Sequence, residues 1–120
     1  MSNYSVEDVL SKYNKGVMFE YDNEQERTFL KLSELFNQSQ QKTHTLHALF
    51  INTKSKYGDE PVAVIEGYYI NLPRHLLDTV KEMREDDDFV HLVNQRKVGM
   101  EIYQYQSRHG LAYSVNWVEV

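Results

Sequence analysis

Two neighbouring stretches near the C-terminus decide the fold: M-E-I-Y-Q-Y-Q at residues 100–106 and L-A-Y-S-V-N-W-V at residues 111–118. Within them, Y-Q-Y-Q at residues 103–106 and Y-S-V-N-W at residues 113–117 alternate apolar or aromatic residues with polar ones, and S-R-H-G at residues 107–110 separates the two stretches. Alternation with a period of two predicts a strand, and a short polar segment with glycine predicts a turn. We therefore expect an antiparallel hairpin that carries Tyr103 and Tyr105 on one face.

A second hairpin is expected upstream, because residues 43–53 and 61–71 are both rich in β-branched and aromatic side chains. Between them, K-S-K-Y-G-D-E at residues 54–60 has the composition of a loop. Tyr68 and Tyr69 are adjacent on the second of these strands. Since neighbouring side chains of a strand point to opposite faces, one of the two tyrosines must point away from the core.

Four segments have the apolar spacing of amphipathic helices, and residues 17–21 alternate like a short strand. The four segments are residues 5–15, 23–36, 73–83 and 87–97. The simplest packing is an α+β fold with one four-stranded, mainly antiparallel sheet built from the two hairpins and about four helices packed on it. A chain of 120 residues fits one domain, so residues 1–120 are interpreted as a single globular unit.

Composition excludes several classes of protein. The chain has no Cys, which leaves no disulfide, no thiol nucleophile and no thiolate metal site, and it fits a reducing cytoplasm. The longest apolar runs, at residues 48–51 and 62–65, are far shorter than the ~20 residues of a membrane-spanning helix. The first residues lack the pattern of a signal peptide. We expect a soluble, cytoplasmic protein with no contact to a membrane.

Acidic residues are concentrated in one segment. The formal net charge is -5, and E-M-R-E-D-D-D at residues 82–88 holds five of the acids and one base. Glu85, Asp86, Asp87 and Asp88 are candidates for an acidic docking patch. The competing explanation is that these acids stabilise the N-terminus of the helix that follows them. No basic patch of the kind that binds nucleic-acid phosphates is present.

Histidine and arginine residues supply the other candidates. Arg74 and His75 follow Pro73 in a first helical turn, where backbone N–H groups attract anions, so they form a candidate anion-binding pair. Arg108 and His109 lie at the tip of the last hairpin as candidate contact residues. His44 and His47 would point to opposite faces of the expected strand 43–53. We therefore expect no metal site and no cofactor.

No catalytic motif is present, so the leading interpretation is a small non-enzymatic protein-binding accessory module. Its expected role is a regulator or inhibitor of a larger bacterial or phage-related protein, and an exposed strand edge favours a homodimer. One alternative is single-stranded nucleic-acid binding on an aromatic sheet face. Another is a small enzyme or anion-binding domain around Arg74 and His75. The candidate protein-binding residues are Tyr69, Glu85, Asp86, Asp87, Asp88, Tyr103, Tyr105, Arg108 and His109.

Overall fold

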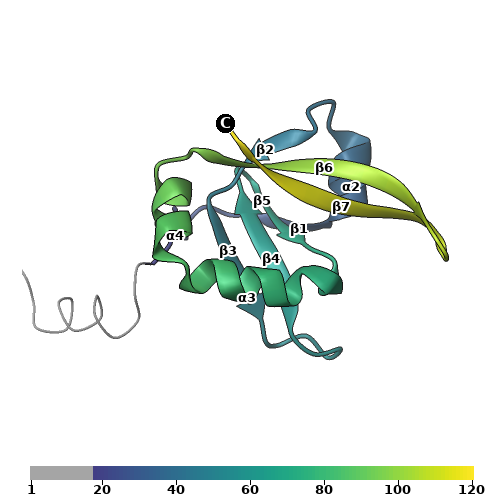
Figure 1. Ribbon diagram of the computed structural model, residues 1–120, viewed down its shortest axis with the longest axis horizontal. Helices are drawn as coiled ribbons and strands as arrows, with labels where there is room; N and C mark the ends of the chain where they lie inside the picture. Colours follow the sequence, from purple (N-terminus) through teal and green to yellow (C-terminus); the bar gives the residue numbers. More distant parts are fainter. Residues whose placement is uncertain (1–17) are drawn as a thin grey trace, which may run out of the picture.

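The computed structural model describes residues 18–120, in which two sheets and three α-helices form a mixed α+β fold (Figure 1). The predicted helix at residues 5–15 lies outside the described residues. In chain order the elements are β1 (Thr28–Lys31), α2 (Leu32–Gln38), β2 (Thr43–Thr45), β3 (Ala48–Asn52), β4 (Glu60–Ile65), β5 (Tyr68–Asn71), the 3₁₀ turn η1 (Arg74–Leu76), α3 (Leu77–Glu85), α4 (Asp87–Asn94), β6 (Val98–Ser107) and β7 (Gly110–Glu119).

The first sheet has four strands in the order β1-β5-β4-β3. β3, β4 and β5 form an antiparallel meander, and β1 joins the edge of β5 in parallel. Residues 61–71, expected as one strand, are divided into β4 and β5 by a tight turn at Glu66 and Gly67. Gly67 has a φ of +81°, a conformation that glycine adopts without steric cost, and this turn folds the segment back on itself.

The second sheet has three antiparallel strands in the order β2-β6-β7. The expected C-terminal hairpin is present as β6 and β7, which pair over ten residues each. Gly110 has a φ of +111°, and the Ser107 hydroxyl donates a hydrogen bond of 2.7 Å to the Gly110 carbonyl across the turn. Two sheets therefore replace the single four-stranded sheet expected from the sequence.

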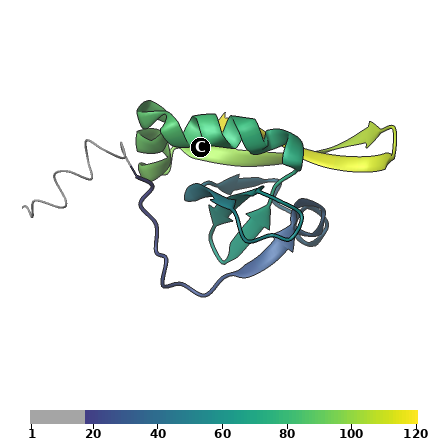
Figure 2. The ribbon, with the colours of Figure 1, turned by 90° about the horizontal axis from the view of Figure 1, so that it is seen from below.

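The two sheets lie in two layers. Figure 2 shows α3, α4 and the β6–β7 hairpin on one side of the four-stranded sheet. The core lies between the layers and is made of aliphatic side chains from both sheets and from the helices. Its most deeply buried members are Leu35, Leu46, Leu49, Ala63, Ile70, Val80, Val93 and Met100. Burial of this apolar surface supplies the main driving force for the fold.

A sharp corner between β2 and β3 divides the segment 43–53 between the two sheets. The Leu46 N–H donates to the Val98 carbonyl, and the next N–H, that of His47, donates to the Val64 carbonyl. Val98 belongs to β6 and Val64 to β4. Leu46 itself is fully buried at the corner. The prediction of one continuous strand is wrong here, because alternation of residue types does not reveal where a strand changes sheets.

The segment 23–36, expected as a helix, is instead divided between a turn at residues 23–25, the strand β1 and the start of the helix α2. Only Leu32, Leu35 and Phe36 of its apolar stripe lie on a helix, α2. The Glu34 side chain accepts a hydrogen bond of 3.0 Å from the Lys31 N–H, which fixes the start of that helix. Pairing with the edge of β5 draws Phe29 into an extended conformation, so a tertiary contact overrides the helical spacing.

Residues 18–20, part of the expected strand 17–21, form no strand but an extended strap on the C-terminal end of α4. The Asn94 side chain accepts 2.7 Å from the Glu20 N–H and donates 3.0 Å to the Met18 carbonyl. The Arg96 guanidinium donates 2.9 Å to the Glu20 carbonyl and 3.1 Å to the Val93 carbonyl. Phe19, between these bonds, packs against the core.

Arg96 occupies the left-handed position that ends α4, with a φ of 60°. Its N–H donates to the Val93 carbonyl and the Lys97 N–H donates to the Leu92 carbonyl, which is the Schellman arrangement. Glycine is the common residue there, and an L-residue costs about 1 kcal/mol more. Hydrogen bonds from the guanidinium to the backbone of α4 and the strap offset that cost.

Arg96→Ala should destabilise the protein by about 2 kcal/mol, because it removes charged hydrogen bonds and keeps the strained backbone. Arg96→Gly should cost about 1 kcal/mol less than Arg96→Ala, because glycine tolerates this φ. Urea unfolding followed by circular dichroism measures both. Equal stability of the two variants would contradict the role assigned to the backbone conformation.

Candidate functional site

The outer surface of the four-stranded sheet carries a cluster of aromatic rings. Phe29 on β1, Phe50 on β3 and Tyr69 on β5 lie on the face of the sheet that points away from the core, and we call these three residues the aromatic face. The adjacent Tyr68 packs against the core. The two neighbouring tyrosines thus point to opposite sides of β5, as the alternation of a strand requires.

The rings of the aromatic face are in mutual contact. The Phe29 and Tyr69 ring centroids lie 4.9 Å apart, and the Phe50 ring meets Tyr69 edge-on at 5.8 Å. Below them, Val62 and Val64 on the central strand β4 are 0% exposed. Phe29 itself remains 50% exposed. The rings therefore shield the outer side of β4 and at the same time present aromatic surface to solvent.

One arginine borders the aromatic face. The Arg27 guanidinium carbon lies 5.7 Å from the Tyr69 ring centroid and 5.5 Å from that of Tyr21. Its nitrogens donate 3.1 Å to the Ile65 carbonyl and 2.6 Å to the Asp22 carbonyl. Arg27 thereby fixes the chain ahead of β1 against the sheet. Among residues 18–120, no helix lies over this face in Figure 2.

Sequence reasoning found one member of the aromatic face and missed two. Tyr69 was a candidate because of its neighbour Tyr68. The spacing around Phe29 predicts a helical stripe, and the composition around Phe50 predicts one long strand. The run Thr28-Phe29-Leu30 has strand-forming side chains, and this was the available signal. Nothing in the sequence indicates that β1 lies beside β5.

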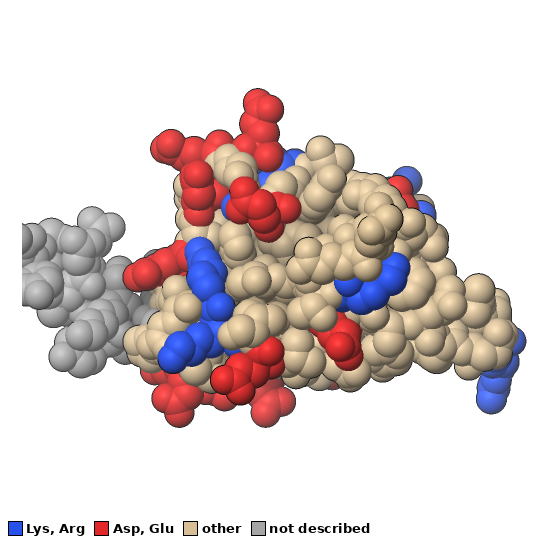
Figure 3. All heavy atoms as spheres, turned by 90° about the horizontal axis from the view of Figure 1, so that it is seen from above, with Lys and Arg blue, Asp and Glu red and all other residues tan. Residues whose placement is uncertain are grey.

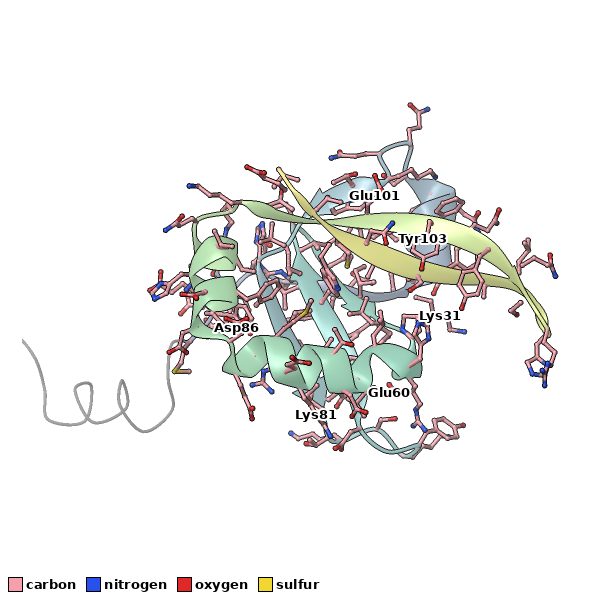
Figure 4. All side chains as sticks on the ribbon, in the orientation of Figure 1. Lys31, Glu60, Lys81, Asp86, Glu101 and Tyr103 are labelled. Atoms are coloured by element: carbon pink, nitrogen blue, oxygen red, sulfur yellow. The ribbon has the colours of Figure 1, made fainter. Side chains whose placement is uncertain are left out.

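The acidic segment acts at the junction of two helices. Glu85 ends α3, and Asp86 is the N-cap of α4 (Figure 4). The Asp86 carboxylate accepts a hydrogen bond of 3.2 Å from the Phe89 N–H. Asp87 and Asp88 lie in the first turn of α4, where the positive end of the helix dipole favours acids. The capping explanation therefore accounts for the position of these residues.

The two side chains of the candidate anion-binding pair make separate contacts. The Arg74 guanidinium donates to the Tyr57 carbonyl in the loop between β3 and β4. The His75 ring nitrogen Nε2 lies 3.4 Å from the Ser114 hydroxyl on β7. The two side chains therefore have contacts on different elements, the loop between β3 and β4 for Arg74 and β7 for His75.

The candidates of the C-terminal hairpin lie on its exposed part. The Tyr103 and Tyr105 rings are 5.9 Å apart on the same face of β6, and both are more than one-third exposed. Arg108 and His109 form the turn at the tip, and both are exposed. These four residues lie on the layer opposite to the aromatic face.

His44 and His47 line one pocket of about 370 Å³, although the sequence placed them on opposite faces of a strand. The corner at Leu46 turns His47 back toward His44. Arg96 and Glu66 line the same pocket, and Nε2 of His44 is buried without a hydrogen-bond partner. Within residues 18–120, no group of three or more His, Cys, Asp or Glu side chains is placed to hold a metal ion.

Both histidines favour the neutral state. Burial lowers the pKa of His44 below the ordinary 6.5, and the positive charge of Lys42 adds to this effect. Burial also lowers the pKa of His47, followed by the charge of Arg96. A hydrogen bond involving the backbone of Gln41 raises the pKa of His44, but by less than burial lowers it. The negative charge of Glu66 likewise raises the pKa of His47 by less than burial lowers it.

Comparison of the chain with protein-family models, with curated proteins and with solved structures found no match. In the part of the chain that the structure describes, no helix has the length and hydrophobicity needed to cross a membrane.

Stability should fall as the pH drops from about 7.5 to about 5.5, because the unfolded histidines take up protons at a higher pH than the folded ones. The two neutral histidines contribute to the free energy of unfolding above the unfolded pKa of 6.5. This contribution is lost as the pH falls below 6.5 toward the lower pKa values of the folded state. Urea unfolding at the two pH values measures the change, in a range where carboxylates stay largely ionised. His44→Phe should reduce the acid sensitivity, and His109→Phe at the exposed tip should not. Equal sensitivity of the two variants would remove His44 from the explanation.

Proposed function

We propose that this protein is a non-enzymatic protein-binding module that docks a partner on its aromatic face. The observation that carries the proposal is the contact of Phe29, Phe50 and Tyr69 on a sheet surface that no helix of residues 18–120 covers. In keeping with a small accessory protein, its role would be to regulate or inhibit a larger bacterial or phage-related protein.

Aromatic and arginine side chains are the residues that most often dominate the binding energy of protein interfaces. Phe29 is half-exposed, so a partner would remove about half of its surface from water. Tyr69 and Phe50 are already held by ring contacts and by the strands beneath them. Fixed rings lose little conformational entropy on binding, which favours affinity.

Single-stranded nucleic acid is the alternative ligand for aromatic rings on a sheet. Arg27 is the arginine beside the rings, and two of its nitrogens already donate to backbone carbonyls. Lys31 is on the same face at the end of β1 (Figure 4). The chain as a whole carries a net charge of -5, which opposes the approach of phosphates. These charges favour a protein partner over a nucleic acid.

An enzyme or anion-binding domain around Arg74 and His75 receives no support from the geometry, because those side chains contact different elements. The acidic segment is also a weaker docking candidate than the aromatic face, because Asp86 caps α4. Of the contact residues expected from the sequence, Tyr69 is the one that belongs to the aromatic face, and it is central to the proposal.

Phe29→Ala should weaken binding of the partner at least about tenfold, because it truncates the most exposed ring of the cluster. The measurement is quantitative affinity capture from extracts of the producing cells, followed by titration of the purified partner. Leu111→Ala is the matched control, since Leu111 is 62% exposed but lies on the other layer.

A partner that binds both variants equally well would remove the aromatic face from the proposal. The nucleic-acid alternative is tested in the same series, with a fluorescent oligothymidylate at low salt. If the native protein binds this probe and Phe29→Ala does not, the ligand of the aromatic face is single-stranded nucleic acid and not a protein.

A further inference from the structure

The distal half of the β6–β7 hairpin is a two-stranded arm that projects past the rest of the molecule (Figure 1). β2 pairs with β6 only at residues 99–101, whereas β7 continues to pair with β6 as far as Ser107. Leu111, Tyr103 and Tyr105 are exposed on the arm. Isolated two-stranded ribbons are marginally stable in water. A third strand paired with the arm would stabilise it and cover part of its apolar surface.

In the part of the chain that the structure describes, one edge of the arm has backbone groups with no strand beside them. The Ile102 N–H points toward β2 and donates 2.9 Å to the Lys42 carbonyl. Along a strand, alternate residues direct their backbone groups to the same edge. Gln104 and Gln106 therefore present their N–H and C=O groups on this edge, beyond the point where β2 has ended.

Within residues 18–120, no strand pairs with this edge beyond the end of β2. The segment I-Y-Q-Y-Q-S at residues 102–107 has no charge, no proline and no glycine, and it consists largely of residues that suit strands. Natural edge strands are usually blocked by lysine, proline or a bulge. An open, neutral edge of this kind is suited to the addition of another strand.

The charges of the arm identify the added strand. Glu101 stands at its base (Figure 4). Arg108 lies in the turn at its tip, and the segment between the two is uncharged. In the space-filling view the visible surface of the arm is uncharged until the basic residue at its end (Figure 3). Two such strands placed antiparallel bring each Arg108 toward the Glu101 of the other, so the edge is complementary to itself.

We propose that a second copy of this chain pairs antiparallel with β6, with the two-fold axis at Tyr105. Gln104 of each copy then exchanges hydrogen bonds with Gln106 of the other, and the two Tyr105 side chains lie opposite one another. The paired segment covers residues 103–107 and stops before Ile102, whose N–H is already bonded to Lys42. An axis at Gln104 would instead require the Ile102 groups and is excluded.

This interface goes beyond the proposed function and does not depend on it. The arm belongs to the three-stranded sheet, and the aromatic face belongs to the outer side of the four-stranded sheet. A variant of the arm therefore tests self-association, and Phe29→Ala tests partner binding.

The register predicts a specific disulfide. The chain has no Cys, so a single introduced Cys can cross-link only with its own copy. Tyr105→Cys should give a covalent dimer under mild oxidation, because opposed residues of a non-hydrogen-bonded antiparallel pair have the Cα separation that a disulfide needs. Leu111→Cys, which is more exposed but lies on β7, should form no covalent dimer under the same oxidation. Absence of the Tyr105→Cys dimer, or equal cross-linking of both variants, would overturn the proposal.

A second variant removes an edge donor and leaves the hairpin intact. Gln106→Pro deletes an N–H that points to the free edge, and proline is tolerated at such positions. Sedimentation should show a dimer for the native chain and a dimer Kd raised at least about tenfold for Gln106→Pro. Gln106→Ala, which keeps the N–H, should remain dimeric, and the circular dichroism of both variants should be unchanged. A monomeric native chain, or a dimer that Gln106→Pro leaves unaffected, would overturn the proposal.

Discussion

The architecture depends on two consecutive backbone hydrogen bonds at the corner between β2 and β3. The Leu46 N–H bonds to β6 and the His47 N–H bonds to β4, so a single peptide step connects the two sheets. Leu46 is fully buried at this point, which anchors the corner in the core. Because the corner places one sheet over the other, it determines which faces become interior and which remain available for contacts.

The division into layers explains the distribution of the aromatic residues. Tyr68 faces the core, whereas Tyr69 joins Phe29 and Phe50 on the outer surface. Tyr103 and Tyr105 lie on a different part of the molecule, on an arm that extends beyond the body. The protein therefore has two separate aromatic surfaces, one on the outer side of the four-stranded sheet and the other on the arm.

Part of the fold and of the site followed from local sequence. The β6–β7 hairpin was predicted because its alternation and its turn agree, and α4 was predicted because acids precede its apolar stripe. The single sheet, the strand at 43–53 and the strand at 61–71 were wrong, since a corner and a two-residue turn leave the overall composition of a segment strand-like. Phe29 and Phe50 were missed for a different reason, because tertiary pairing decides which strands lie side by side and so which rings meet.

The sequence by itself determined a Cys-free α+β chain, a C-terminal hairpin with Tyr103 and Tyr105 on one face, and the opposite orientations of Tyr68 and Tyr69. These properties depend on composition and on the two-residue period of a strand, both of which are local. Tertiary structure alone decided that there are two sheets, that His44 and His47 share a pocket, and that β1 lies parallel to β5. Those outcomes depend on which distant backbone groups meet, and the pattern of residue types along the chain does not encode the choice directly.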